Sequence, residues 1–172
     1  MGTAMIYGVY SAAFGILVML VEHFTGLDVS PTGRYIGFLG MIGLIVCMVM
    51  AMKTRRDEEF EGKLTYGQGV GTGTLVALAS GVILAIYTYI HMAYIAPEMV
   101  DYIKETTRTQ MLTQFHGNQA QVDQAMGYAT MWIGPVAQSL SVLIGSPLIG
   151  VVFALIISIF MKTKPEGADR PV

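Results

Sequence analysis

The residues of this chain that could do chemistry are a few histidines and carboxylates beside long apolar segments. Glu22 and His23 are adjacent, His91 lies near the end of another apolar segment, and Glu98 follows Pro97. An imidazole and a carboxylate that lie close together can bind a metal ion or act as a general acid and base. These four ionisable residues therefore form a candidate polar cluster at the outer boundary of the apolar segments.

The spacing of these residues argues against a metal site and against catalysis. The sequence has no HExxH motif, no cluster of histidine with cysteine, and no two histidines four residues apart. Ser139 and Ser141 lack the GxSxG context of a serine nucleophile. We therefore predict no enzyme activity, no cofactor and no bound metal, and we expect the four residues to be solvated. A membrane enzyme that uses Glu22, His23 or His91 is the less favoured alternative.

The composition explains why so few residues offer chemistry. Of the 172 residues, 53% are apolar and 13% are charged, whereas a soluble domain has about 25% charged residues. One cysteine excludes a disulfide within the chain. The net charge of −2 gives no basic excess, so nucleic acid is not an expected partner.

The uncharged residues are collected into four long segments. A bilayer core of about 30 Å requires roughly 20 apolar residues in a helix, and each segment approaches or exceeds that length. The first segment is expected to be a retained helix, because no Lys or Arg precedes it and Glu22 follows it. We predict an all-α membrane protein that forms one four-helix domain over residues 1–172. The predicted spans are residues 4–21, 35–52, 70–94 and 133–161.

The Lys and Arg residues in the connections predict the orientation. Seven lie in the connection after the second span or in the C-terminal tail, and three lie on the other side. Because basic residues favour the cytoplasmic side, both termini are predicted to be cytoplasmic. Residues 97–131 are then external, and their pattern predicts two short helices interrupted at His116-Gly117-Asn118. This segment either binds a partner or caps a cavity, or it only extends the third helix beyond the bilayer.

Small residues recur at helical spacing within the spans. Lipid gives no hydrophobic reward for helix association, so small residues that allow close backbone approach supply the contacts. They serve packing within the chain, or assembly with other subunits. We therefore expect a scaffold or accessory subunit in a homo-oligomer or larger membrane complex. The predicted packing residues are Gly37, Gly40, Gly69, Gly73, Ala77, Gly81, Ala85, Gly150 and Ala154.

A small-solute or ion permease or channel is the alternative function. The glycines at 67–73 could unwind the start of the third helix, and Pro147 could kink the fourth. Against this, the middle of the spans offers only Ser, Thr and Gln as polar groups. Intramembrane ionisable residues, which usually mark a transport path, are missing there.

Several short motifs resemble a known family. They are Tyr7-Gly8, Phe60-Glu61-Gly62, Tyr66-Gly67-Gln68-Gly69, the Ile95-Ala96-Pro97-Glu98 exit and the Lys-rich tail. In these features the chain resembles small four-helix membrane proteins of Bacteroidota-type bacteria that are grouped only as a domain of unknown function. The resemblance implies a bacterial inner (cytoplasmic) membrane protein with four spans. It implies no activity and no catalytic residues.

Overall fold

A computed structural model of the protein describes residues 2–30 and 33–163, and every regular element within these ranges is a helix. The basic residues Lys164 and Arg170, which contribute to the predicted orientation, lie outside the described residues. The elements are α1 (Thr3–Phe24), α2 (Gly33–Glu58), α3 (Tyr66–Ile90), the π-helix η1 (His91–Ile95), α4 (Glu98–Gln114), α5 (Gln119–Ala129), the 3-10 helix η2 (Thr130–Trp132) and α6 (Pro135–Met161).

Four of these helices are long and apolar enough to cross a membrane. They are α1, α2 from Tyr35 onward, α3 together with η1, and α6. The predicted all-α fold with four candidate spans is confirmed. The second helix continues beyond the apolar run to Glu58, because Arg, Lys and Glu are good helix formers and nothing in this stretch breaks the helix.

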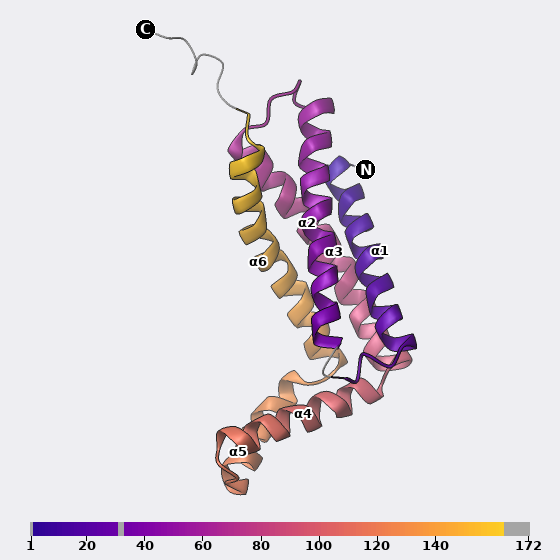
Figure 1. Ribbon diagram of the computed structural model, residues 1–172, viewed down its shortest axis with the longest axis vertical. Coiled ribbons are helices and arrows are strands. Elements are labelled where there is room, and N and C mark those ends of the chain that lie inside the picture. Colours follow the sequence, from indigo (N-terminus) through magenta and orange to yellow (C-terminus); the bar gives the residue numbers. More distant parts are fainter. Residues whose placement is uncertain (1, 31–32, 164–172) are drawn as a thin grey trace.

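The four long helices lie side by side, with α3 between α1 and α6 (Figure 1). One end of the bundle holds the start of α1, the end of α6 and the α2–α3 connection, and we call it the terminal end. The opposite end, from which α4 departs, is the hairpin end. Both described ends of the chain therefore lie at the same end of the bundle.

Small residues bring α3 and α6 together. A Cβ added to Gly73 would lie 2.6 Å from Ala154 Cβ, and one added to Gly69 would lie 2.6 Å from Ser158 Oγ. Gly150 packs in the same way against Ala77. Side chains any larger at these positions would separate the helices. The predicted packing residues Gly69, Gly73, Ala77, Gly81, Gly150 and Ala154 all lie in this α3–α6 interface.

The other predicted packing residues lie elsewhere. A Cβ added to Gly37 or Gly40 would meet nothing within 4 Å, and both residues line a cavity described below. Ala85 lines a groove where α6 diverges from α3. The first helix packs on α3 through Gly8, whose added Cβ would lie 2.5 Å from Ala79 Cβ.

The glycine-rich start of α3 forms a regular helix. Thr65 caps it, since its hydroxyl accepts a hydrogen bond from the Gln68 backbone N–H while the Gln68 side chain accepts from the Thr65 N–H. This capping box fixes the first turn of the helix, so the unwinding considered for a permease is wrong at this position. Pro147 likewise lies inside a helix that continues from Pro135 to Met161.

The segment between α3 and α6 forms a helical hairpin, as the sequence predicts. The helices α4 and α5 extend sideways from the bundle axis below α6 (Figure 1). The turn between them places His116 and Gly117 at φ of 50° and 81°. Arg108 Nη2 lies 2.8 Å from Asp123 Oδ1, which forms an exposed ion pair between the two helices.

The orientation in the membrane stays a prediction and has a direct test. In a Cys47→Ala background, a cysteine at Gln119 in α5 is expected to react with an impermeant maleimide added to intact spheroplasts. A cysteine at Glu59, at the terminal end, is expected to react only after lysis. Both positions are exposed, so their labelling differs through sidedness and not through burial. If Glu59→Cys were labelled in intact spheroplasts and Gln119→Cys were not, the orientation would be the opposite of the predicted one.

Candidate binding site at the hairpin end of the bundle

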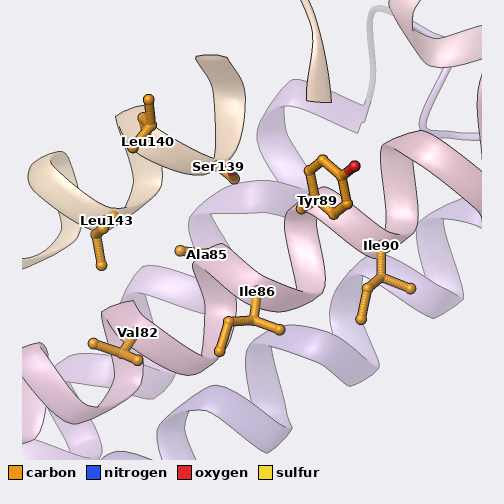
Figure 2. A pocket seen from close by; sticks show the side chains of 8 residues that line it. All are labelled: Val82, Ala85, Ile86, Tyr89, Ile90, Ser139, Leu140 and Leu143. Atoms are coloured by element: carbon orange, nitrogen blue, oxygen red, sulfur yellow. The ribbon is translucent and has the colours of Figure 1, made fainter. Parts of the chain in front are cut away.

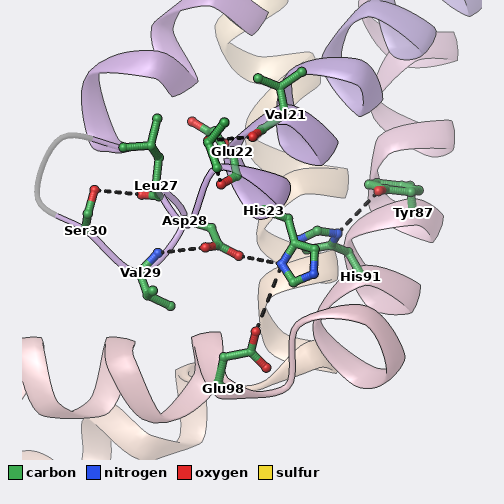
Figure 3. Close-up of polar contacts among 11 residues, drawn as sticks. Val21, Glu22, His23, Leu27, Asp28, Val29, Ser30, Tyr87, His91 and Glu98 are labelled. Atoms are coloured by element: carbon green, nitrogen blue, oxygen red, sulfur yellow. Dashed lines mark hydrogen bonds and ion pairs between the residues drawn. The ribbon is translucent and has the colours of Figure 1, made fainter.

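Three ionisable side chains meet where α1 and α3 end. His23 Nδ1 lies 2.9 Å from Asp28 Oδ2, and the His23 and His91 rings meet edge to face with centroids 5.5 Å apart. One potential ligand atom from each of the three residues lies within 4.8 Å of the other two. Figure 3 shows the three side chains converging from the end of α1, the loop that follows it and η1.

The local backbone explains how Asp28 reaches His23. The first helix ends at Phe24, and Gly26 follows with a φ of 67°, which glycine adopts readily. The chain therefore turns sharply, and Asp28 folds back onto the last turn of α1. Its second oxygen, Oδ1, accepts a hydrogen bond from the Val29 N–H at 3.0 Å, so the carboxylate is held from both sides.

His91 lies at the position where the helix type changes. It begins the π-helix η1, in which the Ala96 N–H donates to the His91 carbonyl at 2.7 Å. A π-turn rotates the side chains that follow it, and such turns often occur at functional sites. Tyr87, one turn earlier, contacts the ring through its hydroxyl, 3.3 Å from His91 Nδ1.

The structure corrects the expectation that these residues are solvated. His91 is 1% exposed, because the end of α1 covers it. His23 is partly buried, and the Asp28 side chain is 4% exposed. Glu98 is the solvated member: its side chain is 56% exposed, and its Oε1 lies 4.0 Å from His23 Nδ1.

Sequence reasoning missed Asp28 and Tyr87 as members of this cluster. Asp28 lies among residue types that are common in turns, so it was not distinguished from an ordinary turn residue. Tyr87 is far from the first helix in the sequence, and no local spacing links the two. Glu22, the fourth predicted member, lies on the neighbouring side of α1, where it lines two cavities.

The first of these, the bundle cavity, has a volume of about 270 Å³ and lies among the four long helices. Its hydroxyl groups come from Ser11, Ser80 and Ser146, and Ser80 Oγ donates to Ser11 Oγ at 3.2 Å. The opening exists because Gly37 and Gly40 on α2 carry no side chain to fill it. Its apolar wall is formed by Val18, Met19, Met41, Leu44, Leu84 and Ile149.

The second, the hairpin cavity, has a volume of about 590 Å³ and lies between α4 and the α1–α2 connection. Its lining is more polar and includes Asp28, Tyr35, Tyr102 and Gln110. Glu22 and Gly37 line both cavities. The two cavities therefore adjoin, and Glu22 stands at their junction.

A third hollow is an apolar groove of about 350 Å³ between α3 and α6 (Figure 2). Ala85 lies at its base, while exposed residues such as Ile86 and Leu140 form its edges. It offers no charged group. The groove is therefore suited to contact with lipid and adds no chemistry to the site.

Comparison with known proteins agrees with this architecture. A family model described as "Protein of unknown function (DUF4199)" matches residues 6–163, which includes all four long helices and the hairpin. The chain belongs to this family. The resemblance noted from the sequence motifs is thereby confirmed for the DUF4199 family, and its description carries no activity to this chain. Neither the curated proteins nor the solved structures that were searched contain a match.

Proposed function

We propose that this protein is a non-catalytic membrane protein that binds a small amphiphilic cation, which enters from the hairpin end. The observation that carries the proposal is the adjoining pair of cavities with Glu22 at their junction. A ligand could place its charged group beside this carboxylate while its apolar part occupies the bundle cavity.

The charge and polarity of the two linings support a cation. Glu22 and Asp28 are carboxylates, and neither Lys nor Arg is among the described residues that line the cavities. Among the described residues that line the cavities, an anion would therefore meet no positive charge and two carboxylates. The bundle cavity is mostly apolar, and an apolar body of matching size gains free energy when it leaves water for such a surface.

The test is binding of benzyltrimethylammonium to the full chain in lipid nanodiscs, measured by calorimetry or ligand-detected NMR. Glu22→Gln is expected to weaken binding by more than 10-fold, because the partly buried carboxylate loses its charge. Glu58→Gln, which removes an exposed carboxylate at the terminal end of the bundle, is the matched control and should leave binding unchanged. Equal affinity for 3-phenylpropionate, an anion of similar shape, would contradict the proposal.

Flux across proteoliposomes distinguishes a permease from a binding protein. The permease alternative gains support from the cavities, which reach from the hairpin end to the hydroxyls of Ser11 and Ser80. Close packing of Gly69 on Ser158 and of Gly73 on Ala154 lies between the bundle cavity and the terminal end. Transport would therefore require α3 and α6 to separate there. If the protein binds the cation but does not carry it across the proteoliposome membrane, a receptor or accessory role is favoured over a permease.

A scaffold or accessory-subunit role is the second candidate, and the hairpin favours it. The hairpin projects beyond the bundle (Figure 1), and Tyr128, Met131 and Trp132 at its return are 68%, 75% and 69% exposed. A second copy of the chain could cover these side chains in the plane of the membrane. A photo-crosslinker at Met131 should then yield a covalent dimer in nanodiscs loaded with two copies. Crosslinks to lipid alone would count against this role.

A further inference from the structure

We infer that His23, Asp28 and His91 form a binding site for a divalent transition-metal ion, with Zn²⁺ as the ion whose preferences they match. The inference goes beyond the proposed cation-binding function: Glu22, which carries that function, is not among the three ligands, and Asp28 is the one residue that the two sites share. Two imidazoles and one carboxylate are a common protein ligand set for zinc, and a fourth position can be taken by water or another side chain.

The distances among the three residues fit a site that closes around an ion. Zinc bonds to nitrogen and oxygen of about 2.0–2.1 Å place tetrahedral ligand atoms about 3.3 Å apart. The ligand atoms here lie within 4.8 Å of one another, and His23 Nδ1 and Asp28 Oδ2 are already 2.9 Å apart. To hold an ion, the ligand atoms would have to close from at most 4.8 Å to about 3.3 Å from one another.

The surroundings hold the ligands in place before any ion arrives. Asp28 is fixed by the Val29 N–H, and the Tyr87 hydroxyl contacts His91 Nδ1, which leaves Nε2 of that ring for the ion. Partners of this kind orient metal-binding histidines and commonly affect metal affinity by 10- to 100-fold.

An ion can reach the site and complete its coordination there. Asp28 lines the hairpin cavity, which provides a route from outside the bundle. Glu98 Oε1 lies 4.0 Å from His23 Nδ1 on an exposed side chain at the start of α4, so it can move to become a fourth ligand (Figure 3). The ion would then connect the end of α1 with the start of η1 and the start of α4.

The spacing of the ligands explains why no metal motif is visible in the sequence. His23 and Asp28 are five residues apart across a turn, and His91 comes from a helix that is distant in the chain. Short zinc motifs place ligands on one helix or one loop. Here the ends of two helices bring the ligands together, which the prediction of no metal did not take into account.

The test is titration of the full chain in nanodiscs with Zn²⁺, followed by calorimetry, and with Co²⁺, followed by visible absorption. One equivalent should bind, and Co²⁺ should give the intense d–d bands of tetrahedral coordination. His91→Ala is expected to weaken Zn²⁺ binding by more than 100-fold. His116→Asn is the matched control, because it removes the exposed histidine of the hairpin and asparagine tolerates its positive φ.

A second variant separates loss of ligation from loss of fold. Asp28→Asn can still hydrogen-bond to His23, so it should keep the wild-type thermal unfolding temperature without metal, yet bind Zn²⁺ at least 10-fold more weakly. Zn²⁺ should also raise the unfolding temperature of the wild-type protein and not that of His91→Ala. Equal Zn²⁺ affinity in wild type and both site variants, or no binding to the wild type, would overturn the inference. In His91→Ala, which leaves the residues that line both cavities unchanged, loss of Zn²⁺ binding with benzyltrimethylammonium binding intact would support the inference and show that the two sites are independent.

Discussion

Replacement of Gly73 by leucine is expected to prevent α3 and α6 from packing and to leave little folded protein. Even a Cβ at this position would lie 2.6 Å from Ala154 Cβ and 2.9 Å from Met52 Cε. Met52 Cε is the end of a flexible side chain, but Ala154 is fully buried and its Cβ can withdraw only if the backbone of α6 moves. Overpacking of a dense interior by a few atoms costs typically about 1–3 kcal/mol. Gly73→Ala should therefore lose about 2 kcal/mol, and Gly73→Leu considerably more.

Gly71 provides the matched control for this experiment. It lies two residues away on the same helix, it is exposed, and a Cβ added there meets nothing within 4 Å. Gly71→Leu changes helix propensity and hydrophobicity as Gly73→Leu does, without a steric conflict. The measurement is reversible unfolding in mixed micelles, followed by circular dichroism. If the two leucine variants were equally stable, the close approach of α3 and α6 at Gly73 would be incorrect.

The same interface shows what could be predicted about the bundle from sequence. A four-residue repeat of Gly and Ala indicates a helix face that packs closely, and Gly73 and Gly81 do lie on such a face. The repeat does not say which helix it meets, since lipid, another subunit and α6 all accept small residues. In the structure, the α3 residues meet Ala154 and Ser158 of the same chain. The small residues on this face of α3 are thus explained by packing within the chain.

The spans were predictable because missing charge is a strong signal over 18 or more residues. The glycines of α2 show where such reasoning ends. Gly37 and Gly40 have the spacing of packing residues, yet nothing lies within 4 Å of a Cβ at either one. They border the bundle cavity, whose other lining residues come from α1, α3, α6 and the rest of α2. Spacing within one helix carries no information about the distance to the next.

The polar cluster was predictable only as a set of residues near one boundary. Glu22, His23, His91 and Glu98 do gather at the hairpin end of the bundle. Their burial depends on how the end of α1 covers η1, a tertiary contact that no local pattern records. The π-turn at His91 likewise has no signal in residue type. It follows directly on the regular helix of α3, which ends at Ile90, and no change in residue type marks the boundary.

Replacement of Arg55 by alanine is expected to lower the free energy of unfolding by about 2–3 kcal/mol through loss of contacts at the terminal end. This is the size of effect typical of hydrogen bonds that involve a charged group. Arg55 Nη1 donates to Thr72 Oγ1 at 2.9 Å, and Nε donates to Glu59 Oε2 at 2.7 Å. The guanidinium carbon also lies 4.9 Å from the centroid of the Phe60 ring. One side chain therefore connects the end of α2, the α2–α3 connection and the first turns of α3.

The neighbouring Arg56 is the matched control, because its ion pair is with the adjacent, exposed Asp57. Arg56→Ala should change stability by less than about 0.5 kcal/mol, as exposed pairs usually do. Arg55→Lys should recover only part of the loss, since an ammonium group cannot make the two directed contacts of a guanidinium. Unfolding in mixed micelles measures all three variants, and equal losses for Arg55→Ala and Arg56→Ala would contradict this role.

The Arg55 interaction also predicts how the difference between the variants depends on pH. Hydrogen bonds from Thr3 and then Arg55 hold the pKa of Glu59 below its ordinary value. A carboxyl group whose pKa is lowered on folding stabilises the protein above its unfolded pKa, and this stabilisation is lost as the pH falls through the folded pKa. The difference in the free energy of unfolding between wild type and Arg55→Ala should therefore be largest at neutral pH and smaller in acid. The part that persists in acid belongs to the contacts with Thr72 and the Phe60 ring, which do not titrate, so the same pH series separates them from the contact with Glu59.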